Sequence, residues 1–168
     1  GQQTRNINQY FDINIKGDPE IVIKNFYKKQ LKTNKIRLDE KRKTPGDIQN
    51  FANKGSKIIK MHPFYPDYLI AEIETYRGCP RSIHGGCSFC SEPLKGLPQF
   101  RPINHIAQEI KNLYDHGIRH IRIGNQPCIF SYQAKKIGIH EFPEPNPEAV
   151  KELFEKITKN TPNLKTLH

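Results

Sequence analysis

Apolar and polar residues alternate with two different periods along the chain, which predicts strands and helices in succession. Residues 11–15 alternate one by one, as in a half-buried strand, and apolar residues then recur at helical spacing from Ile21 to about Leu31. Asp18 suits the N-cap of that helix and Pro19 its first position. We therefore expect one strand and one helix near the N-terminus, too little to enclose a core alone.

From residue 68 onward the pattern predicts strands that alternate with helices of about twelve residues. Such alternation is typical of βαβ units that form a parallel sheet. Asn104 is expected to cap the first helix, and Asn146 begins the second. The expected strands cover residues 68–75, 118–123 and 163–168, and the expected helices run from 104 to 117 and from 146 to about 161.

Composition excludes two classes of protein. The 168 residues have a mean hydropathy of −0.74, and no apolar run approaches the ~18 residues of a membrane helix. Four cysteines are too few for a secreted disulfide scaffold of this length. We expect a soluble, cytoplasmic chain with no membrane contact. Its abundance of isoleucine and lysine resembles proteins of thermophilic archaea, although an AT-rich genome would have the same effect.

The net charge of +10 lies mostly in the first part of the chain. Residues 1–68 hold 14 Lys and Arg against 7 Asp and Glu, and the densest run extends from Lys24 to Lys43. This run is either the electrostatic footprint of an RNA partner or a solvated face of a lysine-rich protein.

Three cysteines lie within twelve residues, Cys79, Cys87 and Cys90, in the loop that is expected after the strand 68–75. Thiolates are soft ligands that suit zinc and iron–sulfur clusters. Gly85 and Gly86 allow the loop to wrap tightly. Three ligands leave one iron of a 4Fe–4S cluster open, whereas a structural zinc site needs a fourth ligand.

Other residues of this region have two interpretations each. His84 or Cys128 would complete a zinc site; otherwise His84 is a loop residue and Cys128 a buried free cysteine. Arg77 and Arg81 either balance an anionic cluster or are solvated. Glu72 and Glu74 share one face of the strand, where they contact substrate or form salt bridges.

The cysteine loop, with Phe89 before Cys90, resembles the start of a radical S-adenosylmethionine (SAM) domain. That family usually has the spacing Cys-x3-Cys-x2-Cys, and the first gap here is seven residues. After the second strand the family has a Gly-Gly-Glu-Pro-like turn; the corresponding residues here are Gly124, Asn125, Gln126 and Pro127. The chain most closely resembles an archaeal group within that family.

The resemblance implies a set of site residues and cofactors. Cys79, Cys87 and Cys90 would bind a 4Fe–4S cluster, and the fourth iron would bind SAM. The Phe89 carbonyl would contact adenine, and Gly124, Asn125, Gln126 and Pro127 would contact the methionine part, with Gln126 as an acceptor for its ammonium group. The cluster would reductively cleave SAM to a 5′-deoxyadenosyl radical, with electrons from a ferredoxin- or flavodoxin-like donor, and RNA is the expected substrate class.

Three segments follow from these patterns. Residues 1–43 resemble the end of a Rossmann-like domain, and residues 44–67 form a basic connector that contains a short helix over 44–53. Residues 68–168 would be the first part of an incomplete parallel (β/α) barrel that ends at His168, short of the ~250 residues of a full barrel. Two alternatives are a zinc-stabilised basic nucleic-acid-binding module without catalysis, and a cluster protein that does not cleave SAM.

Overall fold

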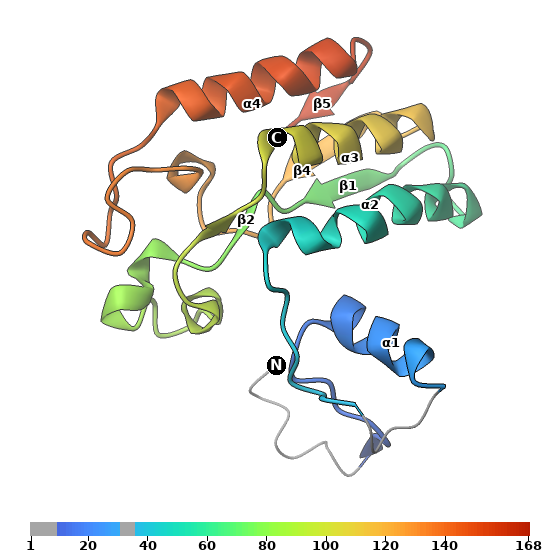
Figure 1. Cartoon of the computed structure of the whole chain (residues 1–168). Helices are drawn as coiled ribbons and strands as arrows, with labels where there is room; N and C mark the ends of the chain where they lie inside the picture. Colours follow the sequence, from blue (N-terminus) through green and yellow to red (C-terminus); the bar gives the residue numbers. More distant parts are fainter. Residues whose placement is uncertain (1–9, 31–35) are drawn as a thin grey trace. The chain divides into compact units, whose positions relative to one another are not determined.

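The structure is a computed structural model that describes residues 10–30 and 36–168 (Figure 1). The chain divides into two units, one up to Ile48 and one from Gln49 to His168. Among the described residues, no helix is long and apolar enough to cross a membrane.

The second unit is a mixed α/β structure built on a three-stranded parallel sheet. Its strands are β1 (Ile70–Ile73), β4 (His120–Ile123) and β5 (Thr166–Leu167), and β4 lies between the other two. The predicted βαβ pattern is therefore confirmed, although β1 is shorter than the expected strand 68–75. Beyond β1 the chain forms a short antiparallel pair of β2 (Tyr76–Arg77) and β3 (Gln99–Phe100), which the patterning did not predict.

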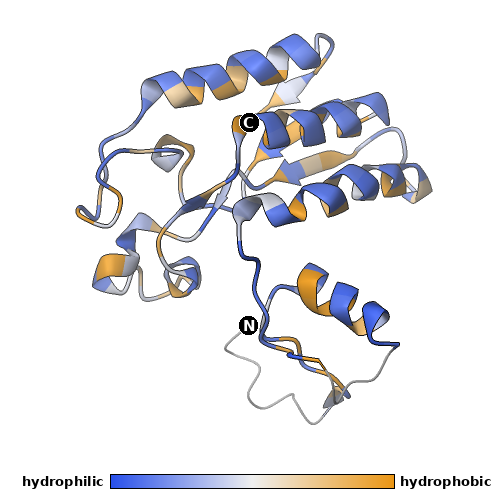
Figure 2. Ribbon diagram, in the orientation of Figure 1, coloured by the Kyte–Doolittle hydropathy of each residue, from blue (hydrophilic) through white to orange (hydrophobic). Residues whose placement is uncertain are grey.

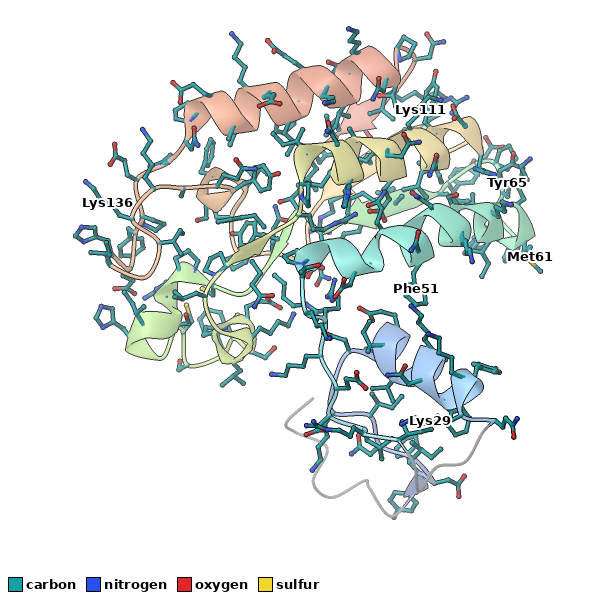
Figure 3. All side chains as sticks on the ribbon, viewed as in Figure 1. Lys29, Phe51, Met61, Tyr65, Lys111 and Lys136 are labelled. Carbon is teal, nitrogen blue, oxygen red and sulfur yellow. The ribbon has the colours of Figure 1, made fainter. Side chains whose placement is uncertain are left out.

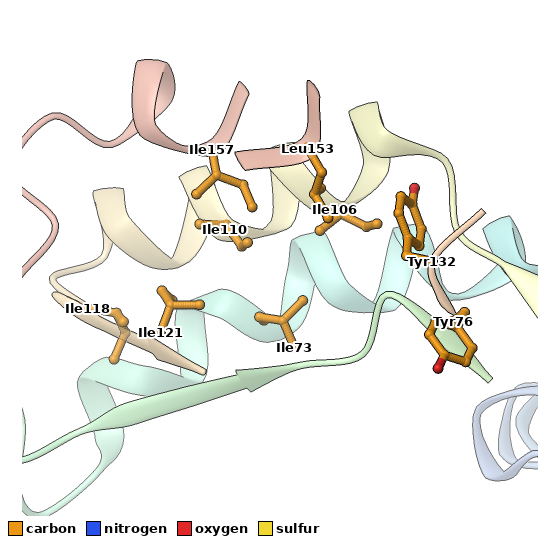
Figure 4. Packing of buried hydrophobic residues seen from close by; sticks show 9 residues of the cluster. All are labelled: Ile73, Tyr76, Ile106, Ile110, Ile118, Ile121, Tyr132, Leu153 and Ile157. Carbon is orange, nitrogen blue, oxygen red and sulfur yellow. The ribbon is translucent and has the colours of Figure 1, made fainter. Parts of the chain in front are cut away.

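Helices α3 (Ile103–Asp115) and α4 (Pro147–Asn160) pack beside each other on one face of this sheet (Figure 1). Their apolar positions recur every three or four residues, so each helix has an apolar side and a hydrophilic side (Figure 2). The core between helices and strands consists of side chains that are at most 3% exposed (Figure 4). They are Ile73, Tyr76, Ile106, Ile110, Ile118, Ile121, Tyr132, Leu153 and Ile157.

The start of α4 confirms one predicted cap and the start of α3 corrects another. Asn146 accepts a hydrogen bond from the Ala149 N–H (3.3 Å), as expected for an N-cap. Asn104 instead lies inside α3, because Pro102 is already the N-cap residue, and its side chain accepts from Lys156 of α4.

Helix α2 (Gln49–Gly55) lies beside α3, where Asn112 donates to the Asn53 side chain (2.9 Å). It follows a 3₁₀ turn (Pro45–Ile48), which agrees with the short helix expected over 44–53, and another 3₁₀ segment (Ser56–Met61) follows. The remaining 3₁₀ turns are Pro80–His84, Glu92–Lys95 and Ile129–Ser131.

The first unit contains helix α1 (Pro19–Lys28), and its N-cap is Asp18 as predicted. The Asp18 carboxylate does not cap the helix; it accepts from the Arg42 N–H (2.6 Å), and the Arg42 guanidinium also pairs with Glu20 (3.0 Å). The Arg42 side chain is only 6% exposed. This member of the basic run is therefore a structural ion pair rather than a free surface charge.

The strand predicted over residues 11–15 is wrong, because these residues have no regular secondary structure. Phe11 and Ile13 are exposed, and no described segment pairs with residues 11–15 as a strand. The chain instead makes main-chain hydrogen bonds just beyond, from the Lys16 N–H to the Leu38 carbonyl (2.9 Å). Leu31, Lys32 and Lys35 of the predicted helix end and basic run lie outside the described residues.

Candidate metal and cofactor site

The predicted site residues lie on two loops that follow the carboxyl ends of neighbouring parallel strands. The cysteine loop follows β1, and the Gly124–Cys128 turn follows β4. The Gly124 N–H donates to the Ile73 carbonyl (3.1 Å), so the two loops start side by side. In open parallel sheets, this edge is where ligands bind.

Two side-chain contacts join these loops. The side-chain amide oxygen of Gln126 accepts a hydrogen bond from the Thr75 N–H (2.7 Å) and another from the Thr75 hydroxyl (2.8 Å). The Tyr76 hydroxyl donates to the Cys128 carbonyl (2.7 Å) and accepts from the Cys128 N–H (3.1 Å). The start of the cysteine loop is thereby fixed to the turn after β4.

These contacts change the chemistry expected of Gln126. Its acceptor oxygen is engaged by Thr75, so it is not free for an ammonium group as the resemblance implied. The Gln126 Nε2 atom is buried and has no hydrogen-bond partner among the described residues. What Gln126 offers to a bound molecule at this edge is a hydrogen-bond donor.

Two of the three cysteine sulfurs receive a hydrogen bond from an N–H group of the same loop. The Arg81 guanidinium donates to Cys87 Sγ (2.9 Å) and the Glu92 main-chain N–H to Cys90 Sγ (3.5 Å). Donors of this kind stabilise negative charge on sulfur.

Cys79 differs from the other two cysteines in its burial, since it is only 5% exposed. Burial raises the pKa of the Cys79 thiol above its ordinary value, the Arg81 main-chain N–H opposes this rise, and the nearby Cys90 and Cys87 add to it. An approaching cation would reverse this balance, because a coordinated thiol is deprotonated.

The loop is compact at Gly86, as its glycine pair predicted. Gly86 has a φ of +77°, and a Cβ atom there would lie 2.0 Å from the Pro93 ring. A side chain at this position would both strain the backbone and displace Pro93. Glycine is therefore required for this path of the chain.

The other predicted residues have varied surroundings. Phe89 is 90% exposed, His84 is exposed, and Asn125 has a φ of +58°, which asparagine tolerates. Pro127 is exposed, and a Cβ atom on Gly124 would meet the Glu72 carboxylate at 2.2 Å.

Cys128 is exposed, which corrects the expectation of a buried cysteine. Its main chain is held by Tyr76.

Among residues 10–30 and 36–168, no group of three or more His, Cys, Asp or Glu side chains forms a preformed metal site. The three cysteines thus share one loop without converging on a common point. All four cysteines are free thiols.

The carboxylates predicted on the strand face form salt bridges. Glu72 pairs with Arg122 across β1 and β4 (3.6 Å), and Glu74 pairs with Arg77 (3.5 Å). Both contacts agree with the salt-bridge interpretation of these residues.

Residues of a third segment also reach the cysteine loop, and the patterning did not predict this. Arg81 forms an ion pair with Glu141, and its guanidinium lies over the Phe142 ring, 5.5 Å from the centroid. These pairs join residues about sixty positions apart, so neither periodicity nor motif spacing indicates them.

No model of a known protein family matches the chain. The chain is 47% identical over 160 residues to an uncharacterised protein of Methanocaldococcus jannaschii, in an alignment that covers 95% of this chain and 29% of the relative. It is 43% identical over 122 residues to an uncharacterised protein of Archaeoglobus fulgidus, which covers 73% of this chain and 22% of the relative. The chain therefore spans less than a third of the length of these archaeal relatives.

Proposed function

We propose that this chain is the cluster-binding part of a radical SAM enzyme, with Cys79, Cys87 and Cys90 as ligands of a 4Fe–4S cluster. The observation that carries the proposal is the N–H donor on two of the three sulfurs, those of Cys87 and Cys90. Iron–sulfur sites use hydrogen bonds to sulfur to stabilise and tune the anionic cluster.

The donor set fits this group in number and kind. Three soft thiols suit iron, and a three-ligand cluster keeps one iron open for a substrate or cofactor. When bound, the cluster supplies the electron that cleaves SAM to a 5′-deoxyadenosyl radical. The protein's own part is to bind, orient and shield the reacting molecules.

The residues at the carboxyl edge have separate parts in this proposal. Gly124 lets the Glu72 side chain lie against the turn, because a Cβ atom there would meet the Glu72 carboxylate at 2.2 Å. The Phe89 carbonyl contacts adenine, Asn125 and Pro127 shape the turn, and the buried Gln126 amide donates a hydrogen bond to the methionine part of SAM. The parallel sheet would be the first part of the incomplete (β/α) barrel.

The proposed partners are a ferredoxin- or flavodoxin-like electron donor and an RNA substrate. RNA is proposed from the net charge of +10. The buried Arg42 ion pair removes one residue from this footprint, so the proposal depends on the other lysines of the first unit.

Anaerobic reconstitution with iron and sulfide tests the cluster. We expect a brown protein with equal amounts of bound iron and sulfide, and loss of both in the Cys79→Ala, Cys87→Ala and Cys90→Ala variants. Cys128→Ala is the matched control, since it removes an exposed thiol outside the three-cysteine loop and should retain the cluster.

The alternatives have different outcomes in the same experiment. Tight zinc binding that depends on Cys128 or His84, without cluster uptake, would favour the zinc module and overturn the proposal. A cluster that forms but yields no 5′-deoxyadenosine from SAM after dithionite reduction would indicate a cluster protein without this activity.

A further inference from the structure

We propose that Arg81 is a positioning residue that raises the reduction potential of the bound cluster. Its guanidinium, held in place by Glu141 and Phe142, donates a charged hydrogen bond to the Cys87 sulfur. This inference rests on the proposed function, because it concerns a cluster on Cys79, Cys87 and Cys90.

Arg81 contacts one of the three cysteine sulfurs directly. Its guanidinium donates to Cys87 Sγ at 2.9 Å. The residue lies in the 3₁₀ turn Pro80–His84, within the seven-residue gap between the first two cysteines. The wide gap therefore brings a guanidinium group directly to a ligand sulfur.

The guanidinium is held in place from the loop between β4 and α4. Glu141 accepts a hydrogen bond from Arg81 Nε, and the Phe142 ring lies under the guanidinium at 5.5 Å. This loop is closed by an isolated β-bridge between Lys135 and Glu144 and by the ion pair of Glu144 with Lys136 (3.2 Å). Lys136 is labelled in Figure 3. Two nitrogens of the guanidinium thus donate to two different partners while its plane lies over an aromatic ring, an environment that suits arginine and not lysine.

A positive donor on a ligand sulfur stabilises the reduced cluster more than the oxidised cluster, because reduction adds negative charge. Hydrogen bonds to the sulfurs and local charge are among the factors that determine cluster potentials. Glu141 influences the potential in two opposite ways: its negative charge lowers it, and its hold on Arg81 raises it.

The test is a potentiometric titration of the reconstituted chain followed by electron paramagnetic resonance. For Arg81→Gln we expect the reduced-to-oxidised ratio at a fixed potential to fall about tenfold, which for one electron corresponds to a shift of about −59 mV. Lys95→Gln is the matched control. Lys95 is a cation of the same loop, and its amino group pairs with Glu92, so the cluster potential should change much less in this variant.

Two further variants keep the test decisive if Arg81→Gln takes up no cluster. Arg81→Lys retains the charge without the planar fork and should give an intermediate potential. Glu141→Ala removes the acceptor that holds Arg81 and should lower the potential, whereas a pure charge effect would raise it.

The outcomes separate this inference from the function on which it rests. An unchanged potential in Arg81→Gln, or an unchanged or higher potential in Glu141→Ala, overturns the role of Arg81 while the cluster proposal stands. Failure of the unmodified chain to bind a cluster overturns both.

Discussion

Two regions of the second unit are held together by different forces. On the helix-covered face of the sheet, apolar side chains of α3 and α4 pack against β1 and β4 with almost no exposure (Figure 4). At the carboxyl edge, the loops are joined by hydrogen bonds from Thr75 to Gln126 and from Tyr76 to Cys128, while Phe89 and Phe142 lie largely exposed. Burial is non-directional, whereas each hydrogen bond at the edge specifies one geometry.

This difference indicates a division of tasks within the unit. The packed face stabilises the sheet, and the edge uses its polar contacts to place the cysteine loop beside the turn after β4. We therefore expect substitutions in the core to affect stability strongly, and substitutions at the edge to affect stability moderately and the site directly.

The largest effect is expected from Leu153→Ala in α4. Leu153 is fully buried between α4, α3 and the sheet, so truncation removes apolar burial and leaves a cavity. We expect the free energy of unfolding to fall by about 3 kcal/mol in urea denaturation.

The control for this substitution is Lys151→Ala in the same helix. Lys151 is exposed and pairs loosely with Glu155 (3.8 Å), so its loss should change stability by less than about 0.5 kcal/mol. Equal effects of the two substitutions would contradict the assignment of Leu153 to the core.

A smaller effect is expected from Tyr76→Phe at the edge. The ring stays buried, but the Cys128 N–H and carbonyl lose their shared partner. We expect a loss of about 2 kcal/mol in unfolding free energy. Tyr68→Phe removes the hydroxyl of a tyrosine that is 92% exposed and should leave stability unchanged.

The packed face was predictable from the sequence and the edge was not. The apolar spacing of Ile106, Ile110, Leu153 and Ile157 predicted both helices, because burial acts on every turn of a helix. The Thr75–Gln126 contact joins residues 51 positions apart and leaves no periodic signal.

Two of the corrected expectations have clear physical causes. Alternation over residues 11–15 predicted a strand, but a strand needs a neighbour, and no described segment provides one. Gln126 was expected to accept a hydrogen bond because residue type alone does not show that Thr75 already occupies its oxygen. The three cysteines were found by their spacing, while the Glu141 and Phe142 contacts of Arg81 required the fold.

The Thr75–Gln126 contact should be measurable as a coupling between the two loops. Thr75→Val removes the hydroxyl donor but keeps the main-chain N–H, and Gln126→Ala removes the acceptor. We expect Thr75→Val to cost about 1 kcal/mol, and the double variant to cost less than the sum of the two single variants. Strict additivity would show that the loops are held independently.

The smallest effect, absent at neutral pH, is an alkaline loss of stability through Tyr76 and Tyr132. Burial raises the pKa of both phenols above the ordinary value, and hydrogen bonds from Cys128 and Gln133 respectively oppose this rise. The folded state thus keeps these protons at a pH where the unfolded chain releases them. Their contribution is complete below the unfolded pKa of about 10 and is lost as the pH rises through the folded values.

Urea denaturation at a series of alkaline pH values measures this contribution. Lysines titrate in the same range, so the informative quantity is the difference between the unmodified chain and the Tyr76→Phe, Tyr132→Phe double variant. We expect the double variant to lose stability less steeply with pH, because two groups that release protons only on unfolding are gone. Parallel slopes would mean that neither phenol is held protonated by the fold, and Tyr76 would then contribute to the edge through its hydrogen bonds alone.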